Sequence, residues 1–456
     1  MSDPLAARLA EWLSALAWKL LPPRQQELGE LRLLDSLGLI LGGATSEATA
    51  IARGYVAAYG GAGRSTLIAG SAGTPPGWTA LVNGIASHCW DFDDTFPDSV
   101  IHPGSMVVPT ALAVGEDTGA SGGEILTAIA GGYEIAARLA GAGGRRFHAR
   151  GFHASGIFAP VIAAFVAARL MRSPPSAMAS AVGLAASMSG GLLAFLADDG
   201  WSKWLHFGWG NFGGILAAGL AQHGFRGPAG ALDGRYNLYD AFLGLTPDPA
   251  AVAAGLGTQW RSEAALFKLY PCAHVIHPYI DLALDLRRSL SLAPQAVKQV
   301  ICTVASWAVP IVCAPAAEKI RPQTALQAIA SLPFQLASAL IDGRVGLDTL
   351  AADNLDRPEV QALAAKVEYV VTDDHEGFAA EIALETVTGE IHRRAGRLVA
   401  VTPERLREKF LDLASPVLGR FQAESAIDAI RQLAAAPDAR QIGRILRSAA
   451  NAAAKR

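Results

Sequence analysis

Apolar residues recur at helical spacing along most of the first half of the chain, and this pattern constrains the fold more than any other feature of the sequence. Leucine and tryptophan residues follow one another at intervals of three or four within residues 4–20, and leucines do the same within residues 25–41. Such spacing gathers apolar side chains on one face of a helix. The pattern recurs in residues 48–59, 106–114, 124–140, 157–170, 176–196 and 212–223. The sequence therefore predicts a succession of packed helices.

The apolar content of the chain allows a large core built from small side chains. Of 456 residues, 51% are hydrophobic, 17% are charged and 47 are glycine. A chain of this length is expected to form two domains, or one large domain with a smaller partner. Because much of the apolar content is alanine and glycine, we expect helices that pack closely over small side chains.

The sequence pattern changes near residue 265, where alternation of apolar and polar residues replaces the helical spacing. Alternating segments, typical of strands, occupy residues 297–304, 367–371, 382–387 and 391–394. In the first of them, Val300, Cys302 and Val304 share one face, and a Thr-Gly-Glu turn separates the last two. The second part of the chain is therefore predicted to contain a sheet as well as helices.

The predicted fold class is mainly α, with a large all-helical domain and a smaller α+β domain. We expect the all-helical domain at residues 1–266, completed by residues 401–456, and the α+β domain at residues 267–400. Polar residues of the first domain concentrate in the predicted connections between helices. Binding and catalytic groups tend to lie on such connections, so we searched them for chemistry.

Charge and cysteine usage argue against several classes of function. The net charge is −3 and the Lys and Arg residues are scattered, so the chain lacks the basic surface of a nucleic-acid-binding protein. The four cysteines form no CxxC pair and no zinc or iron–sulfur spacing. With no secretory signal at the N-terminus, we expect reduced thiols in a cytoplasmic protein.

Residues 173–197 carry no charge over 25 residues, a length that raises the possibility of a membrane span. The segment contains two prolines, five serines and many small residues, and no aromatic belt flanks it. These features favour a buried central helix and no interaction with a membrane.

The densest polar stretch lies inside apolar sequence, at residues 81–109. It contains Asp91, Asp93, Asp94 and Thr95, followed by His102 in a His-Pro-Gly-Ser turn. Polar groups buried without partners cost several kcal/mol. These residues must therefore be hydrogen-bonded, paired or catalytic.

Four further polar clusters accompany this stretch. They are His148 with His153, Lys203 with His206, Lys268 with His274 and His277, and Lys319 with Arg321. Histidines carry protons near neutral pH, while Lys and Arg hold carboxylates. Removing a proton next to a carboxylate requires a base, together with cations or donors where negative charge develops. The inventory suits acid–base chemistry on a small polyanion.

Each cluster also has a structural interpretation. The Asp-rich run is a common helix cap or turn, and Lys203, which lies between two tryptophans, can extend its stem over aromatic rings. The carboxylates with His102 also offer oxygen and nitrogen ligands to a divalent metal. No nucleophile elbow, HExxH, Walker A or dinucleotide motif is present in the required context. The residues alone therefore indicate a cofactor-free acid–base enzyme.

Several long motifs together resemble the MmgE/PrpD family, whose members include 2-methylcitrate dehydratase, cis-aconitate decarboxylase and iminodisuccinate epimerase. The motifs that carry the resemblance are LVNGIASHCWDFDDT, HPGSMVVPTALAVGE, GFHASGIFAPVIAA, WSKWLHFGWGNFGGILAA, FKLYPCAHVIH, RPQTALQAIASLPFQLASAL and TPERLREKF. They cover most of the chain in the family's order, and their number makes the resemblance specific.

The resemblance implies a large helical domain, an α+β lid domain and a homodimer. It also implies an active site between the domains, with no metal and no organic cofactor, that acts on a small di- or tricarboxylate. The absence of cluster-ligating cysteines agrees with this, because an aconitase-type dehydratase would need them.

The family's functional residues transfer to matching positions of this sequence. The catalytic candidates are Asp93, His102, His153 and Lys203. The substrate-binding candidates are Thr95, Lys268, His274, His277 and Arg321. Either Lys203 or His153 is expected to be the base, with Asp93 and His102 serving the other side of the substrate. Asp91 and Asp94 are expected to be structural.

The sequence departs from the family pattern at two places. Many relatives have His after the DFDDT motif, where this chain has Phe96. In the family's decarboxylases a catalytic His lies two residues after the Pro of the Lys-aromatic-Pro motif. Here His274 lies three residues after Pro271, which is one place later than in the decarboxylases. We therefore expect a 2-methylcitrate dehydratase-like lyase. The alternatives are an epimerase or isomerase of an amino- or imino-dicarboxylate, a cis-aconitate-type decarboxylase, and a non-catalytic polyanion binder.

Overall fold

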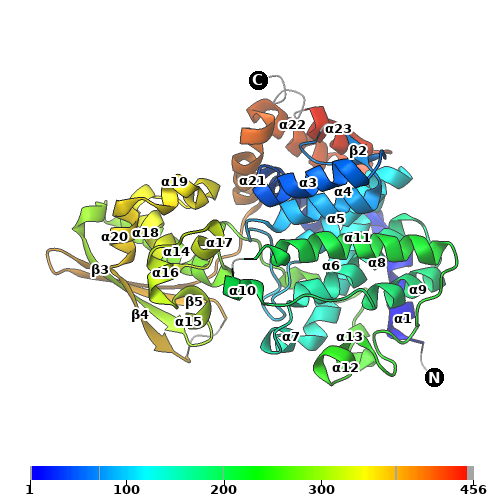
Figure 1. The fold of residues 1–456 in the computed structure, drawn as a ribbon, viewed down its shortest axis with the longest axis horizontal. Coiled ribbons are helices and arrows are strands. Elements are labelled where there is room, and N and C mark those ends of the chain that lie inside the picture. The colour runs from blue at the N-terminus through cyan, green and yellow to red at the C-terminus, as the bar shows by residue number, and fades with distance from the viewer. Residues whose placement is uncertain (1–2, 71, 199, 375–376, 449–456) are drawn as a thin grey trace. The chain divides into compact units, whose positions relative to one another are not determined.

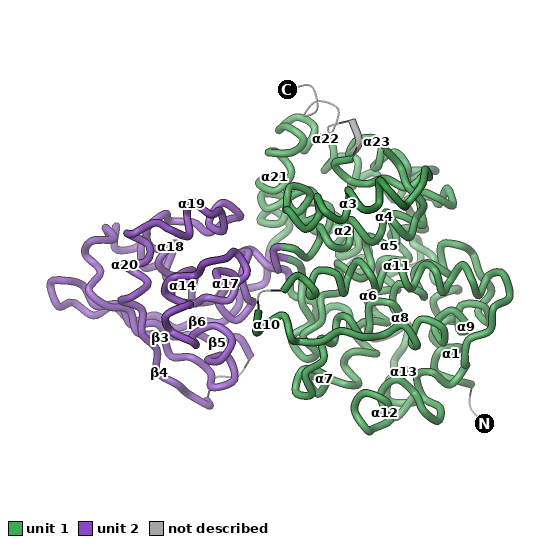
Figure 2. Tube along the Cα trace, in the orientation of Figure 1, with its two compact units in different colours: residues 1–89, 93–266, 402–456 green, residues 90–92, 267–401 purple. Residues whose placement is uncertain are grey.

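A computed structural model describes residues 3–70, 72–198, 200–374 and 377–448. Residues 1–2 and 449–456 of the expected helical domain lie outside this part of the chain. The chain forms two compact units, which Figure 2 distinguishes by colour. Unit 1 comprises Met1–Cys89, Asp93–Leu266 and Thr402–Arg456, and unit 2 comprises Trp90–Phe92 and Phe267–Val401. The predicted fold class is confirmed, because the first unit is helical and the second combines helices with a sheet.

Unit 1 consists of packed helices, which Figure 1 labels. Its helices are α1 (Leu5–Ala15), α2 (Pro23–Gly43), α3 (Glu47–Tyr59), α4 (Pro76–His88), α5 (Pro103–Thr118), α6 (Gly122–Gly143), α7 (Arg146–Ala149), α8 (Ala154–Leu170), α9 (Pro175–Ala186), α10 (Phe195–Asp198), α11 (Ser202–Gln222), α12 (Leu238–Leu243), α13 (Pro249–Ala253), α21 (Pro403–Leu418), α22 (Arg420–Arg431) and α23 (Arg440–Ser448). Strands β1 (Ser65–Thr66) and β2 (Gly73–Thr74) pair as a short antiparallel ladder.

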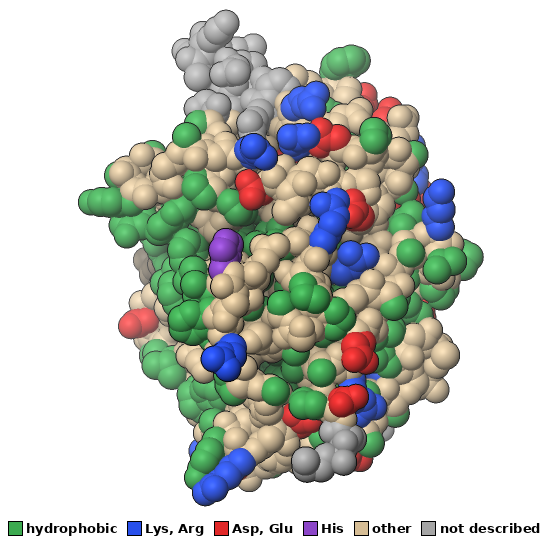
Figure 3. Space-filling model, turned by 90° about the vertical axis from the view of Figure 1, so that its right-hand side faces the viewer, with side chains coloured by type: hydrophobic (Ala, Val, Ile, Leu, Met, Phe, Trp, Pro, Cys, Tyr) green, Lys and Arg blue, Asp and Glu red, His purple; other side chains and the backbone are tan. Residues whose placement is uncertain are grey.

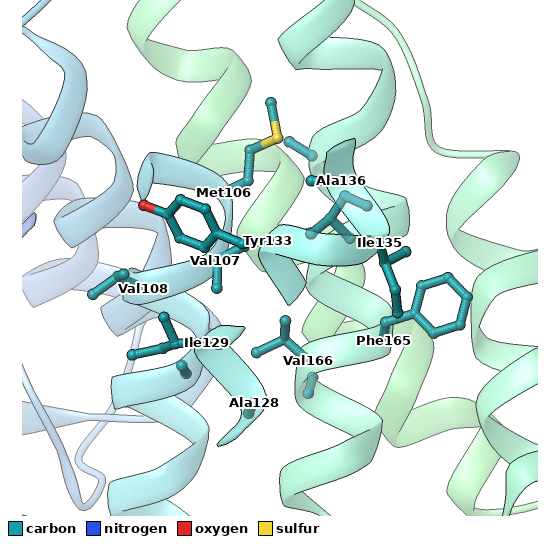
Figure 4. Close-up of a cluster of buried hydrophobic side chains, with 14 of the residues drawn as sticks. Met106, Val107, Val108, Ala128, Ile129, Tyr133, Ile135, Ala136, Phe165 and Val166 are labelled. Carbon is teal, nitrogen blue, oxygen red and sulfur yellow. The ribbon is translucent and has the colours of Figure 1, made fainter. Parts of the chain in front are cut away.

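The core of unit 1 lies between α5, α6 and α8 (Figure 4). Helix α8 is buried on every side, and of its residues Arg169 alone is not fully covered. Figure 4 shows Val107 of α5 and Ile129 of α6 in the same cluster as Val166 of α8. Burying a side chain of this size contributes about 1.5–3 kcal/mol. This core fixes the loops at the N-termini of α5 and α8, where the polar clusters lie.

Glycines allow α11 to lie against α8 at close range, as the composition predicts. A Cβ atom at Gly210 would lie 2.3 Å from Cβ of Ala159, and one at Gly214 would lie 2.4 Å from Cβ of Ala163. Both distances are shorter than any real contact between such atoms, so only glycine fits these positions. On the same helix, a Cβ at Gly219 would have no neighbour within 4 Å.

Three local expectations are wrong. The helix expected at residues 176–196 ends at Ala186, before a Ser- and Gly-containing segment. The helix expected at residues 212–223 begins at Ser202 instead, and Gly210 and Gly214 within it are packing positions. The sequence also predicts a Gly-, Ser- and Pro-rich loop over residues 60–80, and helix α4 begins within that range. Among the helices of the described residues, none has the length and apolarity needed to cross a membrane.

Unit 2 is a four-stranded sheet with helices on one face. Its elements are α14 (His277–Ser289), β3 (Val297–Ala305), α15 (Val309–Val312), α16 (Ala316–Ile320), α17 (Ala325–Ile329), α18 (Leu332–Asp342), α19 (Ala352–Leu355), α20 (Pro358–Ala364), β4 (Val367–Thr372), β5 (Ala379–Thr386) and β6 (Ile391–Arg397). The strand order is β4-β3-β5-β6, with β4 parallel to β3 and the other pairs antiparallel. Val300, Cys302 and Val304 are buried on one face, so the predicted strand alternation is confirmed.

The close packing of α11 predicts opposite effects for one substitution at two glycines of the same helix. Gly214→Ala should lower the free energy of unfolding by about 1–3 kcal/mol, because the added methyl overlaps α8. Gly219→Ala should raise it by about 0.5–1 kcal/mol, because alanine favours the helix and meets nothing. Urea unfolding of both variants measures the difference. Equal effects would contradict the packing described here.

Candidate active site

The carboxylate of Asp93 is the centre of a buried hydrogen-bond cluster in unit 1. Its Oδ1 and Oδ2 lie 2.8 and 3.0 Å from Nδ1 of His88, and Oδ2 accepts a hydrogen bond of 2.5 Å from the Ser105 hydroxyl. Nδ1 of His102 lies 3.2 Å from Oδ1. Asp93 is 1% exposed and His88 is fully buried. Four polar side chains thus satisfy one another inside an apolar unit.

The neighbouring Asp94 fixes this cluster to the N-terminus of α5. Its Oδ1 accepts the backbone N–H of Gly104 at 2.9 Å, and its Oδ2 accepts the hydroxyl of Tyr133 at 2.7 Å. A carboxylate is favoured at a helix N-terminus, where backbone N–H groups lack partners. A Cβ at Gly104 would lie 2.9 Å from this carboxylate, so glycine is required there. Asp94 is therefore structural, as expected.

The charge states within the cluster follow from burial and hydrogen bonding. Burial lowers the pKa of His88 to about 4, against the raising effect of Asp93, so His88 is neutral at pH 7. Burial alone would raise the pKa of Asp93, but His88 and His102 outweigh it and hold that pKa well below 3.8. Burial raises the pKa of Asp94 to about 6. Asp93 is therefore a fixed anion that accepts hydrogen bonds from the side chains around it.

The tautomer of His102 is set by the acceptors around its Nδ1. The backbone oxygen of Asp94 lies 3.1 Å away, Oδ1 of Asp93 3.2 Å and the Thr95 hydroxyl 3.4 Å. With acceptors on this side, Nδ1 carries the proton and Nε2 is the atom that can exchange one. The predicted residues Asp93, Thr95 and His102 are thus brought together.

A second cluster in unit 1 contains His153, Lys203 and His206. His153 precedes the first residue of α8, and the other two lie in the first turns of α11. Nδ1 of His153 lies 2.9 Å from Nδ1 of His206. The ammonium of Lys203 lies 5.8 Å from the centre of the Phe195 ring. Lys203 was expected on a connection, and its place on a helix corrects that expectation.

The ring of Phe207 joins the two clusters. It is fully buried on α11, and its centre lies 4.1 Å from that of His88, 6.1 Å from that of His102 and 5.8 Å from that of His153. An apolar ring in this position keeps the imidazoles in a region of low polarity. Charge placed there interacts more strongly than in water.

Burial also keeps the second cluster's histidines neutral. It lowers the pKa of His153 well below 6.5, and Lys203 lowers it further. The same two causes lower the pKa of His206 to about 4. Burial lowers the pKa of His148 to about 4, and its ring centre lies 6.0 Å from that of His153. At neutral pH these imidazoles can accept a proton but do not carry a positive charge.

The remaining predicted residues belong to unit 2. The ammonium of Lys268 is 1% exposed and donates to the backbone oxygen of Asp91 at 2.6 Å and to its Oδ1 at 2.8 Å. The rings of His274 and His277 lie 4.6 Å apart. Arg321 is exposed directly after α16. Asp91 is thus the partner of a lysine, in line with the expected structural role.

The cluster around Asp93 also contains the oxygen and nitrogen atoms that a divalent metal ion could bind. Within unit 1, His88, Asp93 and His102 each offer a ligand atom, and these atoms lie within 4.8 Å of one another. Nδ1 of His88 and Nδ1 of His102 both lie within 3.2 Å of the Asp93 carboxylate, to which they can donate. A metal ion bound through these two Nδ1 atoms would have to displace their protons.

A hollow of about 640 Å³ lies elsewhere, on the uncovered face of the sheet in unit 2. Its lining includes Ile301 of β3, Val370 of β4, Ala383 of β5 and Arg393 of β6. None of the predicted site residues lines it. A sheet with antiparallel strand pairs commonly leaves one face to solvent, and the hollow lies on such a face.

Three residues of the site were not among the predicted site residues. His88 and Ser105 hold Asp93, and His206 pairs with His153. Ser105 belongs to the His-Pro-Gly-Ser turn, and His206 belongs to the polar cluster with Lys203, but the sequence assigned neither of them a role in the site. His88 lies in the last turn of α4, a helix that the sequence pattern did not predict.

Comparison with protein families identifies the chain. The model of the MmgE/PrpD N-terminal domain matches residues 7–249, and the model of the MmgE/PrpD C-terminal domain matches residues 270–435. The chain belongs to the MmgE/PrpD family. The resemblance seen in the sequence is thereby confirmed.

Curated relatives of this MmgE/PrpD protein are named as decarboxylases. The cis-aconitate decarboxylase-like protein oryM of Aspergillus oryzae is 24% identical over 464 residues, which cover 96% of each chain. Cis-aconitate decarboxylase of Homo sapiens is 26% identical over 427 residues, covering 88% of this chain and 86% of the relative. Cis-aconitate decarboxylase of Aspergillus terreus is 24% identical over 460 residues, covering 94% and 93%.

The cluster around Asp93 predicts a pH-dependent loss of stability in one variant. Asp93→Asn should lower the free energy of unfolding by about 2–3 kcal/mol at pH 7, because it leaves buried donors without a charged acceptor. The pKa of Asp93 is lowered by folding, so the wild type's advantage is present above pH about 4 and is lost below it.

Urea unfolding at several pH values measures this effect. Asp98→Asn, at an exposed position five residues further along, serves as the control and should leave stability unchanged. An advantage of the wild type that grows as the pH falls below 4 would contradict the assigned charge of Asp93.

Proposed function

We propose that this chain is a lyase that dehydrates a citrate-like hydroxy-polycarboxylate, such as 2-methylcitrate, by general acid–base chemistry without a cofactor. The observation that carries the proposal is the arrangement in unit 1, where the buried imidazole of His153 lies in one cluster with Lys203 and is joined through Phe207 to the Asp93 cluster. A neutral base beside a fixed cation is what proton removal next to a carboxylate requires.

The proposed roles follow the charge states of unit 1. His153 takes the proton from the carbon next to a carboxylate, because burial and Lys203 keep it neutral. Lys203 balances the negative charge that then develops. His102 enters this step as the imidazolium, with its Nδ1–H donated to Asp93, and gives its Nε2 proton to the departing hydroxyl, which leaves as water. Asp93 stabilises His102 while it is charged, as carboxylates do for imidazoles in other acid–base sites.

The substrate-binding part of the proposal rests on the family resemblance. It assigns the carboxylates of a di- or tricarboxylate to Thr95, Lys268, His274, His277 and Arg321. Lysine, arginine and histidine donors gathered for carboxylates suit a small polyanion better than a nucleic acid or a membrane. We also propose a cytoplasmic location, which the four buried free thiols support, because free thiols are typical of a reducing compartment.

A second candidate reaction is decarboxylation of cis-aconitate. The names of the curated relatives favour it, and it also requires a proton to move at a carbon next to a carboxylate. The place of His274, three residues after Pro271, is the sequence feature against it. Epimerisation of an amino- or imino-dicarboxylate would use the same first step, followed by reprotonation on the other face.

Product analysis tests the proposed reaction. Chelator-treated protein is incubated with 2-methylcitrate, citrate and cis-aconitate in heavy water, and the products are followed by NMR. The expected result is an alkene from a hydroxy acid, without release of carbon dioxide. Carbon dioxide from cis-aconitate alone would replace the proposal with the second candidate, and deuterium incorporation without an alkene would indicate epimerisation. Binding without turnover, or loss of activity on chelation, would contradict the proposal.

Substitution of Lys203 tests the assigned site more directly than product analysis does. Lys203→Met keeps the apolar stem but removes the charge, so kcat/KM should fall about a hundredfold or more while the fold persists. Lys19→Met, at an exposed position near the N-terminus, is the matched control and should retain full activity. Full activity of Lys203→Met on the accepted acid would contradict the assignment of the site.

We further propose that the chain forms a homodimer through an aromatic strip on unit 1. The strip consists of Ile51, Tyr55 and Tyr59 of α3, Trp78 of α4, and Leu205, Trp209, Phe212 and Leu216 of α11. Its rings follow one another at centre distances of 4.7–6.0 Å. Figure 3 shows hydrophobic side chains gathered along its left-hand edge, which is the side that faces the viewer in Figure 1.

The size and charge of the strip favour a second copy of the chain as its partner. Tyr59 is 70% exposed and Trp209 is 46% exposed. Six of its eight members are 43–70% exposed, and at about 100 Å² each they offer roughly 600 Å². That reaches the upper end of the usual apolar patch of a monomer and approaches the ~800 Å² per partner of a standard interface. None of its residues is charged, so two copies can face each other without repulsion.

A charge in the strip should dissociate the dimer. Tyr55→Glu places two like charges opposite each other in a symmetric interface, so the dimer should weaken at least tenfold in light scattering after gel filtration. Phe421→Glu, which changes an 80% exposed residue of α22 outside the strip, should leave the dimer intact. A monomeric wild type, or a dimer dissociated by Phe421→Glu but not by Tyr55→Glu, would contradict the proposal.

A further inference from the structure

The imidazoles of His153 and His206 form a hydrogen-bonded pair, through which a proton can move from one ring to the other. Their Nδ1 atoms lie 2.9 Å apart, and each imidazole nitrogen either carries a hydrogen or accepts one. A hydrogen bond at this distance therefore holds a single proton between the two rings. One ring has the proton on Nδ1 and a bare Nε2, and the other ring, if neutral, carries its proton on Nε2.

The surroundings keep both rings neutral and in place. The ionisable groups that act on the pair are Lys203, His148, His88 and His102. All of them are cationic or can become so, so a further positive charge on His153 is unfavourable. The backbone N–H of His153 donates to the oxygen of Gly191 at 3.0 Å.

Glycines hold the loop before α10 against the second ring. Gly191 has φ 141°, a conformation that favours glycine, and a Cβ there would lie 3.2 Å from Cε1 of His206. A Cβ at Gly156 would lie 3.2 Å from Cγ of the same ring. The His206 ring is therefore confined from two sides while it faces His153.

The two rings differ in their access to water. His153 is 2% exposed, whereas His206 is only partly buried on the first turns of α11. A base as buried as His153 cannot easily keep the proton that it removes, because an imidazolium there would be desolvated beside Lys203. A path to water through the second ring removes that cost.

We propose that His206 is the proton outlet of His153 and that the two form a relay from the substrate to solvent. The inference rests on the proposed function. His153 starts with its proton on Nδ1 and a bare Nε2, and His206 carries its proton on Nε2.

The relay conserves protons at every step. Nε2 of His153 takes the proton from the carbon next to the carboxylate, and the C–H electron pair becomes the new C=C bond as the C–O bond breaks. The hydroxyl leaves as water with the Nε2 proton of the His102 imidazolium. The Nδ1 proton of His153 moves to Nδ1 of His206, and the Nε2 proton of His206 passes to water. Both rings end neutral, and exchange with solvent restores their starting tautomers.

Substitution of His206 separates a relay from a merely structural contact. In His206→Asn the amide oxygen occupies the place of Nδ1 and still accepts from His153, but the side chain cannot pass a proton on. The expected result is a fall in kcat of about a hundredfold with KM changed by less than about twofold. His206→Phe, which also removes the acceptor, should lose at least as much. His223→Asn, at the other end of α11, is the matched control and should retain full activity.

A measurement without substrate tests the pair independently of the reaction. Nitrogen NMR of the histidine-labelled protein reports the tautomer of each ring at pH 7. The expected result is Nδ1–H on His153 and Nε2–H on His206, with both rings neutral. An imidazolium at either ring, or Nε2–H on both, would overturn the relay. If no acid is turned over, the proposed function fails while this measurement still decides the tautomers. If an acid is turned over and His206→Asn keeps full activity, the relay alone fails.

Discussion

The buried carboxylate of Asp93 is the constraint on which the rest of the site depends. An ionised carboxylate inside a helical core is tolerated only when donors surround it, because an uncompensated buried charge costs several kcal/mol. Here the donors come from the end of α4, the loop before α5 and the first turn of α5. The chain must bring three segments together to satisfy one side chain. In doing so it fixes the tautomer of His102 and the position of its exchangeable Nε2.

Close packing of α8 and α11 provides the second constraint. Glycines at the contact let the helices approach until side chains at their N-terminal ends meet, and His153 and His206 then lie 2.9 Å apart. The same approach places Phe207 against the imidazoles of His88, His102 and His153, and burial keeps His88 and His153 neutral. The chemistry proposed for the MmgE/PrpD chain thus follows from small residues in a helical interface as much as from the polar groups themselves.

Periodicity predicted the fold class because it reports which face of each element is buried. The alternation of Val300, Cys302 and Val304 correctly placed a strand. Asp93, Thr95 and His102 could also be grouped from sequence, since they are close along the chain and must satisfy each other. Their grouping follows from the cost of burying polar groups.

Other parts of the site could not be predicted, for physical reasons. Glycine occurs both in turns and in close contacts, so its presence before residue 212 does not reveal that the helix extends back to Ser202 and carries Lys203. His88 is a single histidine in an apolar segment, and only its contact with Asp93 gives it a role. Pairing between residues 53 positions apart, such as His153 and His206, depends on helix packing that no local pattern reports.

A crystal structure with a bound acid tests the central claim most directly. The account predicts that 2-methylcitrate or cis-aconitate binds in unit 1 with a carboxylate within about 2.6–3.2 Å of the Lys203 ammonium and a carbon facing Nε2 of His153. An acid bound only away from Lys203 and His153, for example in the hollow on the sheet of unit 2, would contradict it.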